Sequence, residues 1–255
     1  AVELADFEKM EEIRARVDSI VKDPQTAEAL KPYYRQFCKR PCFHNEYLET
    51  FNRPSVTLVD TQGRGVDRIT AKGVEVQGQE YELDCLIYAT GFEVGTDYSH
   101  RADIQLLGRD GTSLTEAWAG GVRSLHGMHV NGFPNCFIMS NSQAGFTASY
   151  PHLLDEQAKH LTYIIKAASD KGCVEVEVTE QSETRWVQHC IDKARDAGDF
   201  LENCTPGYYN NEGRAGDRNA QDGFYGGGSV EFFRLLQEWR DEGGLEGLEL
   251  KPSES

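Results

Sequence analysis

The chain has 255 residues, enough to bury a substantial hydrophobic core in one large domain or two small ones. It carries 26 basic and 42 acidic residues, a formal net charge of −16, which argues against nucleic acid or an anionic membrane as its main partner. No apolar run approaches the roughly 20 residues of a membrane-spanning helix, and the N-terminal stretch is too charged for a signal peptide. We therefore expect a cytoplasmic globular protein.

The cysteines are scattered along the chain, odd in number and without paired spacing, which predicts reduced, intracellular thiols. They are Cys38, Cys42, Cys85, Cys136, Cys173, Cys190 and Cys204. Cys38, Cys42 and His44 stand close enough to suggest a metal site, but no second pair of ligands follows at the spacing of a zinc finger. We therefore predict no metal centre.

The N-terminal region is expected to be helical. Apolar residues at three- and four-residue spacing predict an amphipathic helix over residues 3–22, and a short second helix is predicted over residues 26–30. The prolines at 24 and 32 separate and end these helices. Since the sequence starts inside a helix without an initiating Met, we expect it to be a piece of a longer protein.

Lys39 and Arg40 form the most concentrated positive charge near a predicted strand edge in this acidic chain. They are either a solvated surface pair or an anion clamp, in which Lys acts as a point charge for phosphate and Arg as a planar donor fork. The pair precedes a predicted strand at 56–60. A small meander follows, with strands predicted near 66–70, 74–77 and 79–83.

Residues 85–89, Cys-Leu-Ile-Tyr-Ala, form a short apolar run without polar alternation, which predicts a strand buried on both faces of an α/β sheet. Thr90 and Gly91 end it. Open α/β sheets bind ligands just beyond the carboxyl ends of their strands, where a Gly lets the backbone approach a ligand closely. The alternative is a core strand that ends in an ordinary turn.

The C-terminal part repeats this order once more. A short strand at 137–139 runs into a small-residue loop at 140–150, and Pro151 opens a helix. Such a loop can present backbone N–H groups to an anion or cofactor, although this one lacks the spaced glycines of a dinucleotide fingerprint. The other predicted elements are helices at 113–119, 182–197 and 230–241, a strand at 174–178, and a long glycine-rich segment between 204 and 228.

Three segments, taken together, resemble a known family. They are Cys-Lys-Arg at 38–40 with Glu-Tyr-Leu-Glu-Thr-Phe-Asn-Arg-Pro-Ser-Val-Thr-Leu-Val-Asp at 46–60, Tyr-Glu-Leu-Asp-Cys-Leu-Ile-Tyr-Ala-Thr-Gly-Phe at 81–92, and Asn-Gly-Phe-Pro-Asn-Cys-Phe-Ile-Met at 131–139. In this order they resemble the C-terminal half of the Baeyer–Villiger monooxygenases, flavin enzymes that insert one oxygen atom of dioxygen beside a ketone carbonyl. The resemblance extends from about Phe37 to the last predicted helix.

The resemblance implies an α/β fold built from the C-terminal parts of two Rossmann-like dinucleotide-binding domains. Residues 1–35 would end a helical insertion, residues 36–84 would belong to the NADP-binding domain, and residues 85–255 would belong to the FAD-binding domain with its substrate-lining loops. The family's Gly-x-Gly-x-x-Gly loops and the fingerprint between them are absent from this sequence. A missing N-terminal half, a partner chain or a homo-oligomer would then have to cover the open sheet edges.

The resemblance also assigns roles to individual residues. Lys39 corresponds to the lysine that recognises the 2′-phosphate of NADPH, and Arg40 to the active-site arginine, whose permanent charge can stabilise negative charge during oxygen transfer. The further residues expected at the cofactor are Thr90, Gly91, Phe92, Asn141, Pro151 and Tyr208. The residues expected to line the substrate pocket are Phe146, Thr147 and Ala148.

The implied activity is the FAD- and NADPH-dependent conversion of a ketone and O₂ into an ester or lactone by the complete enzyme, with the 255-residue chain inactive alone. Two alternatives stay open. The chain could be a non-catalytic fragment or split half that needs a partner chain, or a flavin enzyme that oxygenates nitrogen or sulfur or simply oxidises NADPH. The sequence does not identify the ketone.

Overall fold

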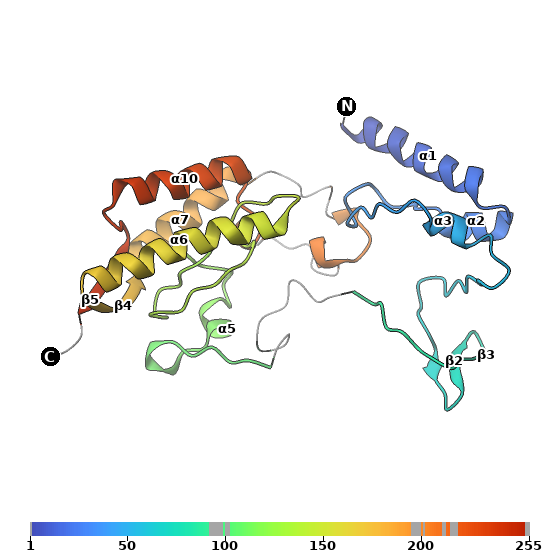
Figure 1. Ribbon diagram of the computed structural model, residues 1–255, viewed down its shortest axis with the longest axis horizontal. Helices are drawn as coiled ribbons and strands as arrows, with labels where there is room; N and C mark the ends of the chain where they lie inside the picture. Colours follow the sequence, from blue (N-terminus) through green and yellow to red (C-terminus); the bar gives the residue numbers. More distant parts are fainter. Residues whose placement is uncertain are drawn as a thin grey trace. The chain divides into compact units, whose positions relative to one another are not determined.

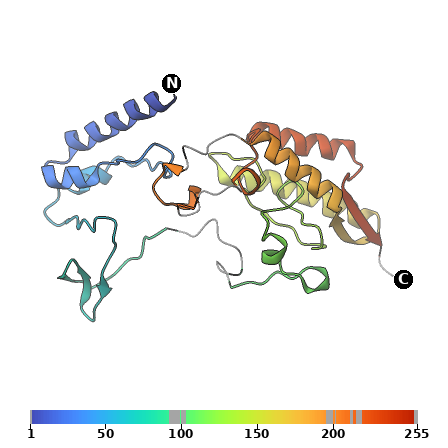
Figure 2. The same ribbon diagram turned by 180° about the vertical axis from the view of Figure 1, so that it is seen from behind.

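The computed structural model describes residues 2–91, 99, 103–194, 200, 202–210, 213–214 and 219–252. The chain divides into two compact units, whose elements are labelled in Figure 1 and seen from behind in Figure 2. Unit 1 consists of Ala1–Val94 and Leu201–Gly213, and unit 2 of Gly95–Phe200 and Arg214–Ser255. The stretches of the two units therefore alternate along the sequence.

Unit 1 begins with the two predicted helices. α1 spans Val2–Ile20 and α2 spans Pro24–Leu30. Asp23 caps α2, because its carboxylate accepts a hydrogen bond of 2.8 Å from the backbone N–H of Thr26. Val17, Val21 and Ala27 form a small core with apolar side chains on and next to the short helix α3, Tyr47–Thr50.

The predicted meander is confirmed as a three-stranded antiparallel sheet in the order β1-β2-β3. Its strands are short: β1 is Arg68–Ile69, β2 is Gly73–Val76 and β3 is Gln79–Glu82. Gln77 and Gly78 both have positive φ, 53° and 79°, as the tight turn between β2 and β3 requires.

Two predicted strands of unit 1 are wrong as regular structure. Residues 56–60 and 85–89 pair with no other strand in the described part of the chain. The second run was expected to be buried on both faces, yet Ile87 is 82% exposed and Tyr88 is 69% exposed. A strand exists only when neighbours satisfy its backbone groups, and among the described residues no strand lies beside this one.

Unit 2 is built on three long helices, which both views show side by side: α6 (Tyr150–Asp170), α7 (Glu180–Lys193) and α10 (Ser229–Glu242). Their main core is formed by Leu125, Met128, Ala144, Leu153, Leu161, Val178, Trp186, Cys190, Tyr225, Phe232 and Leu236. The predicted helices that opened at Pro151, 182 and 230 are thus confirmed, with shifted ends.

The predicted strand at 174–178 is confirmed as β4, Cys173–Val178, but its partner was not foreseen. β5, Leu248–Pro252, pairs with it antiparallel. Asn135 satisfies the other edge of β4: its side chain accepts from Val176 N and donates to Val174 O, both at 2.9 Å. The strand predicted at 137–139 is wrong, because these residues make only an isolated bridge among the described residues. Both sheets in the described part of the chain are antiparallel.

Short elements connect these helices. The predicted helix near 113–119 is α5, Leu114–Ala117, fixed by a capping box between Ser113 and Glu116. The others are η1 (Arg109–Gly111), η2 (Tyr208–Asn210) and α9 (Asn219–Asp222). Arg109 of η1 contacts Glu175 and Glu177 of β4. No helix among the described residues has the length and apolar character needed to span a bilayer.

Three histidines are buried in unit 2, His126, His129 and His160. The rings of His126 and His160 lie 5.3 Å apart, edge to face. Both nitrogens of His160, Nδ1 of His126 and Nε2 of His129 lack a hydrogen-bond partner among the described residues. Burial lowers their pKa values, to about 3 for His126, about 4 for His129 and about 2 for His160, where the other two histidines and Arg240 add repulsion.

We expect the free energy of unfolding to fall as the pH drops below about 6.5, the pKa of histidine in an unfolded chain. Below that pH the unfolded chain takes up protons that the folded core excludes, so acid favours unfolding. Replacing His160 with Leu should lower the slope of unfolding free energy against pH by about 1.4 kcal/mol per pH unit. Urea denaturation at several pH values measures this slope.

The matched control is His152→Leu, which removes an exposed histidine from the same helix, α6. The control should keep the wild-type slope. An unchanged slope in the His160 variant, or an equal reduction in both variants, would contradict the assignment of acid sensitivity to the buried histidines.

Candidate functional site

The predicted site residues fall into two groups, one in each unit. Lys39, Arg40, Thr90, Gly91 and Tyr208 belong to unit 1. Asn141, Phe146, Thr147, Ala148 and Pro151 belong to unit 2. Phe92 lies outside the described residues.

The basic pair follows directly after a disulfide. Cys38 is bonded to Cys204, and both are buried, with 2% and 7% of their surface exposed. This corrects the prediction that all seven cysteines are reduced thiols; Cys42, Cys85, Cys136, Cys173 and Cys190 are free. The partners are 166 residues apart, so their spacing in the sequence gave no indication of the bond.

Lys39 and Arg40 have different surroundings. Lys39 is half-buried, and its ammonium group donates a hydrogen bond to the backbone carbonyl of Pro206. A Cβ at Gly207 would lie only 2.8 Å from Nζ of Lys39, so the glycine leaves room for the ammonium. Arg40 is exposed, and no hydrogen bond or ion pair of its guanidinium is found within the described residues. Its positive charge is therefore available to a ligand.

The segment that contains Pro206, the partner of Lys39, is held together by the side chain of Asn210, which is 2% exposed. Its side-chain oxygen accepts hydrogen bonds of 3.0 Å from the backbone N–H groups of Gly207 and Gly213. Its amide nitrogen donates to the carbonyl of Cys204 at 3.1 Å. Tyr208 begins the 3₁₀ turn within this segment. One buried side chain thus connects Cys204, Gly207 and Gly213, and the sequence analysis did not identify it.

Thr90 and Gly91 end the exposed, unpaired run at 85–91. Gly91 has φ 90°, a conformation that side chains rarely adopt, and no atom lies within 4 Å of where its Cβ would be. Gly91 thus has a backbone conformation that favours glycine, but the buried strand expected before it is not found in the described part of the chain.

In unit 2 the predicted substrate loop is anchored by Gln143, which is fully buried. Its Oε1 accepts from the Ser124 hydroxyl at 2.6 Å, and its Nε2 donates to the carbonyls of Val122 at 2.7 Å and Gln221 at 3.0 Å. The backbone carbonyl of Gln143 accepts a bond of 3.3 Å from the Trp186 indole. The sequence analysis missed this anchor, because a glutamine among small polar residues resembles ordinary loop sequence.

The predicted substrate residues follow Gln143 and face outward. Phe146 is 46% exposed, and Ala148 and Pro151 are also exposed, while Thr147 and Asn141 are half-buried. The ring of Phe146 packs on that of Phe224, with the ring centroids 4.5 Å apart. The loop therefore presents small and aromatic side chains on an accessible surface.

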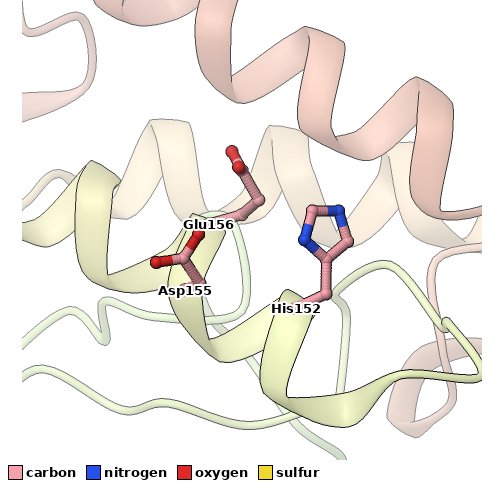
Figure 3. Close-up of side chains that lie close together, drawn as sticks. All are labelled: His152, Asp155 and Glu156. Atoms are coloured by element: carbon pink, nitrogen blue, oxygen red, sulfur yellow. The ribbon is translucent and has the colours of Figure 1, made fainter.

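A possible cation site also lies on α6. Figure 3 shows His152, Asp155 and Glu156 on its first turns, and their potential ligand atoms all lie within 4.8 Å of one another. The ammonium of Lys159, however, lies 2.8 Å from a carboxylate oxygen of Asp155 and 2.8 Å from one of Glu156. Since Lys159 already pairs with both carboxylates, we assign no metal to this cluster.

The chain is similar to curated proteins over nearly its whole length. It is 56% identical over 253 residues to a pentalenolactone D synthase of Streptomyces exfoliatus, which covers 98% of this chain and 43% of the relative. It is 48% identical over 250 residues to a Baeyer–Villiger monooxygenase of Stachybotrys chlorohalonatus, with 98% and 40% covered. The chain thus spans about two fifths of the length of these relatives. No family model matches it.

Solved structures show the same relationship. The polycyclic ketone monooxygenase of the thermophilic fungus Thermothelomyces thermophila matches with a TM-score of 0.87 and 40% identity, covering 97% of this chain and 40% of that one. Similar structures at 28% and 26% identity were solved with NADP⁺ and with FAD and NADP.

Replacing Gln143 with Leu should lower the free energy of unfolding by about 2–5 kcal/mol, since each buried partner left unpaired costs about 1–3 kcal/mol. Urea denaturation measures the change. Gln188→Leu is the matched control, because Gln188 is exposed on α7 and bonds only Asp192 in the same helix. That change should cost less than about 0.5 kcal/mol. Equal losses in the two variants would show that Gln143 does not anchor the loop.

Proposed function

Because sequence and fold both relate this chain to the Baeyer–Villiger monooxygenases, we propose that it forms the C-terminal part of an FAD- and NADPH-dependent enzyme of this kind. The complete enzyme would use O₂ to convert a ketone into an ester or lactone. The observation that carries the proposal is the pair Lys39 and Arg40 in a chain of net charge −16. The ammonium of Lys39 is hydrogen-bonded to Pro206, and the guanidinium of Arg40 has no partner among the described residues.

The domain boundaries follow the same proposal. Residues 1–35 end a helical insertion, residues 36–84 belong to the NADP-binding domain, and residues 85–255 to the FAD-binding domain. Ile87 and Tyr88 are exposed in this chain, and strands from the rest of the enzyme would cover them and satisfy their backbone groups. On this view the chain by itself is inactive, because it lacks the glycine-rich loops that hold the dinucleotides.

The residues present fit an anionic cofactor. Lys39 gives one N–H to the carbonyl of Pro206 and has others left for the 2′-phosphate of NADPH, with which a lysine acts as a compact point charge. Thr90, Gly91 and Phe92 would approach a dinucleotide at the end of the strand that residues 85–89 would form in the complete enzyme. Tyr208 lies two residues after Pro206, the partner of Lys39. Bound FAD, reduced by NADPH, would supply the chemistry that activates oxygen.

Arg40 would act on the reacting groups. A guanidinium keeps its charge throughout the physiological pH range and can stabilise an oxygen atom on which negative charge develops. Its exposed, unpaired state means that no internal ion pair must be broken first. Phe146, Thr147 and Ala148 would line the ketone pocket, with Asn141 and Pro151 towards the flavin.

We expect Arg40→Ala, made in the full-length protein that carries this chain, to leave NADPH-dependent flavin reduction largely intact. Ester formation should fall at least about 100-fold, the usual cost of removing a group that stabilises transition-state charge. Stopped-flow absorbance follows flavin reduction, and gas chromatography of the ketone reaction measures ester.

Arg64→Ala is the control, because Arg64 is exposed in a turn and its side chain bonds only Gln62 among the described residues. It should leave both steps unchanged. Normal ester formation by the Arg40 variant would remove this residue from the active site. Oxygenation of amines or sulfides with no ester from any ketone would instead favour an N- or S-oxygenase.

A further inference from the structure

The basic pair is tied twice to the segment around residue 206. Cys38 is joined to Cys204 by the disulfide, with the Cα atoms 5.2 Å apart. The next residue, Lys39, donates from its ammonium group to the carbonyl of Pro206. Two adjacent residues are therefore attached to a stretch that lies more than 160 residues further along the chain.

Each side of this double connection is fixed independently. On one side, Cys38 N donates to the carbonyl of Arg35 at 3.1 Å, and Gln36 N donates to the Asp6 carboxylate of α1 at 2.9 Å. On the other side, Asn210 binds Cys204 and Gly207, as described above. The disulfide thus joins two segments of unit 1, each of which has hydrogen bonds of its own.

The side chain of Lys39 is ordered by a single hydrogen bond. It is long and flexible, and its only polar contact among the described residues is with the carbonyl of Pro206. Lysine side chains lose considerable rotamer freedom when they are ordered, so a single hydrogen bond at a half-exposed site orders them weakly. The position of its carbonyl partner, and hence of the ammonium, depends on the neighbouring covalent bond.

We propose that the Cys38–Cys204 disulfide is a positioning device for cofactor recognition, which holds Lys39 against Pro206 and Gly207 where its ammonium meets the 2′-phosphate of NADPH. This inference rests on the role proposed above for Lys39. Only NADPH carries that phosphate, so the disulfide should affect the use of NADPH and leave the use of NADH unchanged. A purely structural crosslink would affect both cofactors alike.

The effect should be reversible. A dithiol such as dithiothreitol gives two electrons and two protons to the disulfide, yielding the thiols of Cys38 and Cys204, and is itself oxidised to a cyclic disulfide. Both cysteines are buried, so reduction is expected to need a high concentration of the dithiol or a long incubation.

The test uses the full-length protein that carries this chain. Non-reducing peptide mapping first establishes whether Cys38 and Cys204 are linked; free thiols at both positions would overturn the inference. The KM and kcat for NADPH and for NADH are then measured with the Cys38→Ser/Cys204→Ser variant and with wild type before and after dithiothreitol. Cys173→Ser, which removes a free thiol in β4 of unit 2, is the control.

We expect the KM for NADPH to rise about tenfold in the double variant and in the reduced wild type, as for the loss of one contact to a charged group. The kcat, the KM for NADH and the control should stay at wild-type values. Gly207→Ala should also raise the KM for NADPH with the disulfide intact, because its Cβ would meet Nζ of Lys39. This second variant tests whether the position of the ammonium matters. If the double variant is unstable, the reduction of wild type with dithiothreitol still tests the disulfide.

Lys39→Met separates failure of this inference from failure of the proposed function. If Lys39→Met raises the KM for NADPH and neither the double variant nor reduction does, the disulfide is not a positioning device and the role of Lys39 stands. If Lys39→Met leaves the preference for NADPH unchanged, both proposals are overturned. Equal rises in the KM for NADPH and for NADH in the double variant would also overturn the inference.

Discussion

The disulfide between Cys38 and Cys204 is the constraint on which the candidate cofactor site depends. It closes a loop of 166 residues, and in the chain-entropy model closing a loop of this length stabilises the folded state by about 5 kcal/mol. The first stretch of unit 2, Gly95–Phe200, lies in the sequence between the two cysteines, so the bond joins the two parts of unit 1 that flank this stretch. The buried side chain of Asn210 then gives the returning segment its shape. Lys39 donates its hydrogen bond to a carbonyl of this segment, that of Pro206.

The two units differ in how completely they bury their apolar residues. Unit 2 buries apolar side chains of α6, α7, α10 and β4 in its core clusters, and burial lowers the pKa values of its three buried histidines. Unit 1 has a small core beneath α1 and α2, a short meander, and an exposed apolar run at 85–89. A strand of an α/β sheet appears as an exposed apolar run of this kind when its neighbouring strands belong to another part of the protein. This agrees with a chain that spans about two fifths of its relatives.

Local sequence rules predicted the elements that local contacts stabilise. The helices α1, α2, α6, α7 and α10 and the meander were all foreseen, because periodicity, caps and turn residues act over a few positions. The prediction of a strand at 85–89 was wrong, because a strand depends on pairing partners that the periodicity of the sequence does not reveal. β5, the disulfide and the anchoring role of Gln143 were also not predicted, since each joins positions far apart in the sequence. The role of Asn210 was not predicted either, although its partners Cys204, Gly207 and Gly213 lie within six residues of it. For the site, the resemblance supplied the names of the residues, and the structure supplied the surroundings that distinguish Lys39 from Arg40.

The most direct test of the account is product analysis of the full-length protein with NADPH, a cyclic ketone and isotopically labelled dioxygen. The account predicts a lactone that contains one labelled oxygen atom, formed as NADPH is consumed. Consumption of NADPH with release of hydrogen peroxide and recovery of every ketone tested unchanged would contradict it. The protein would then be a flavin oxidase that shares the fold and not the reaction.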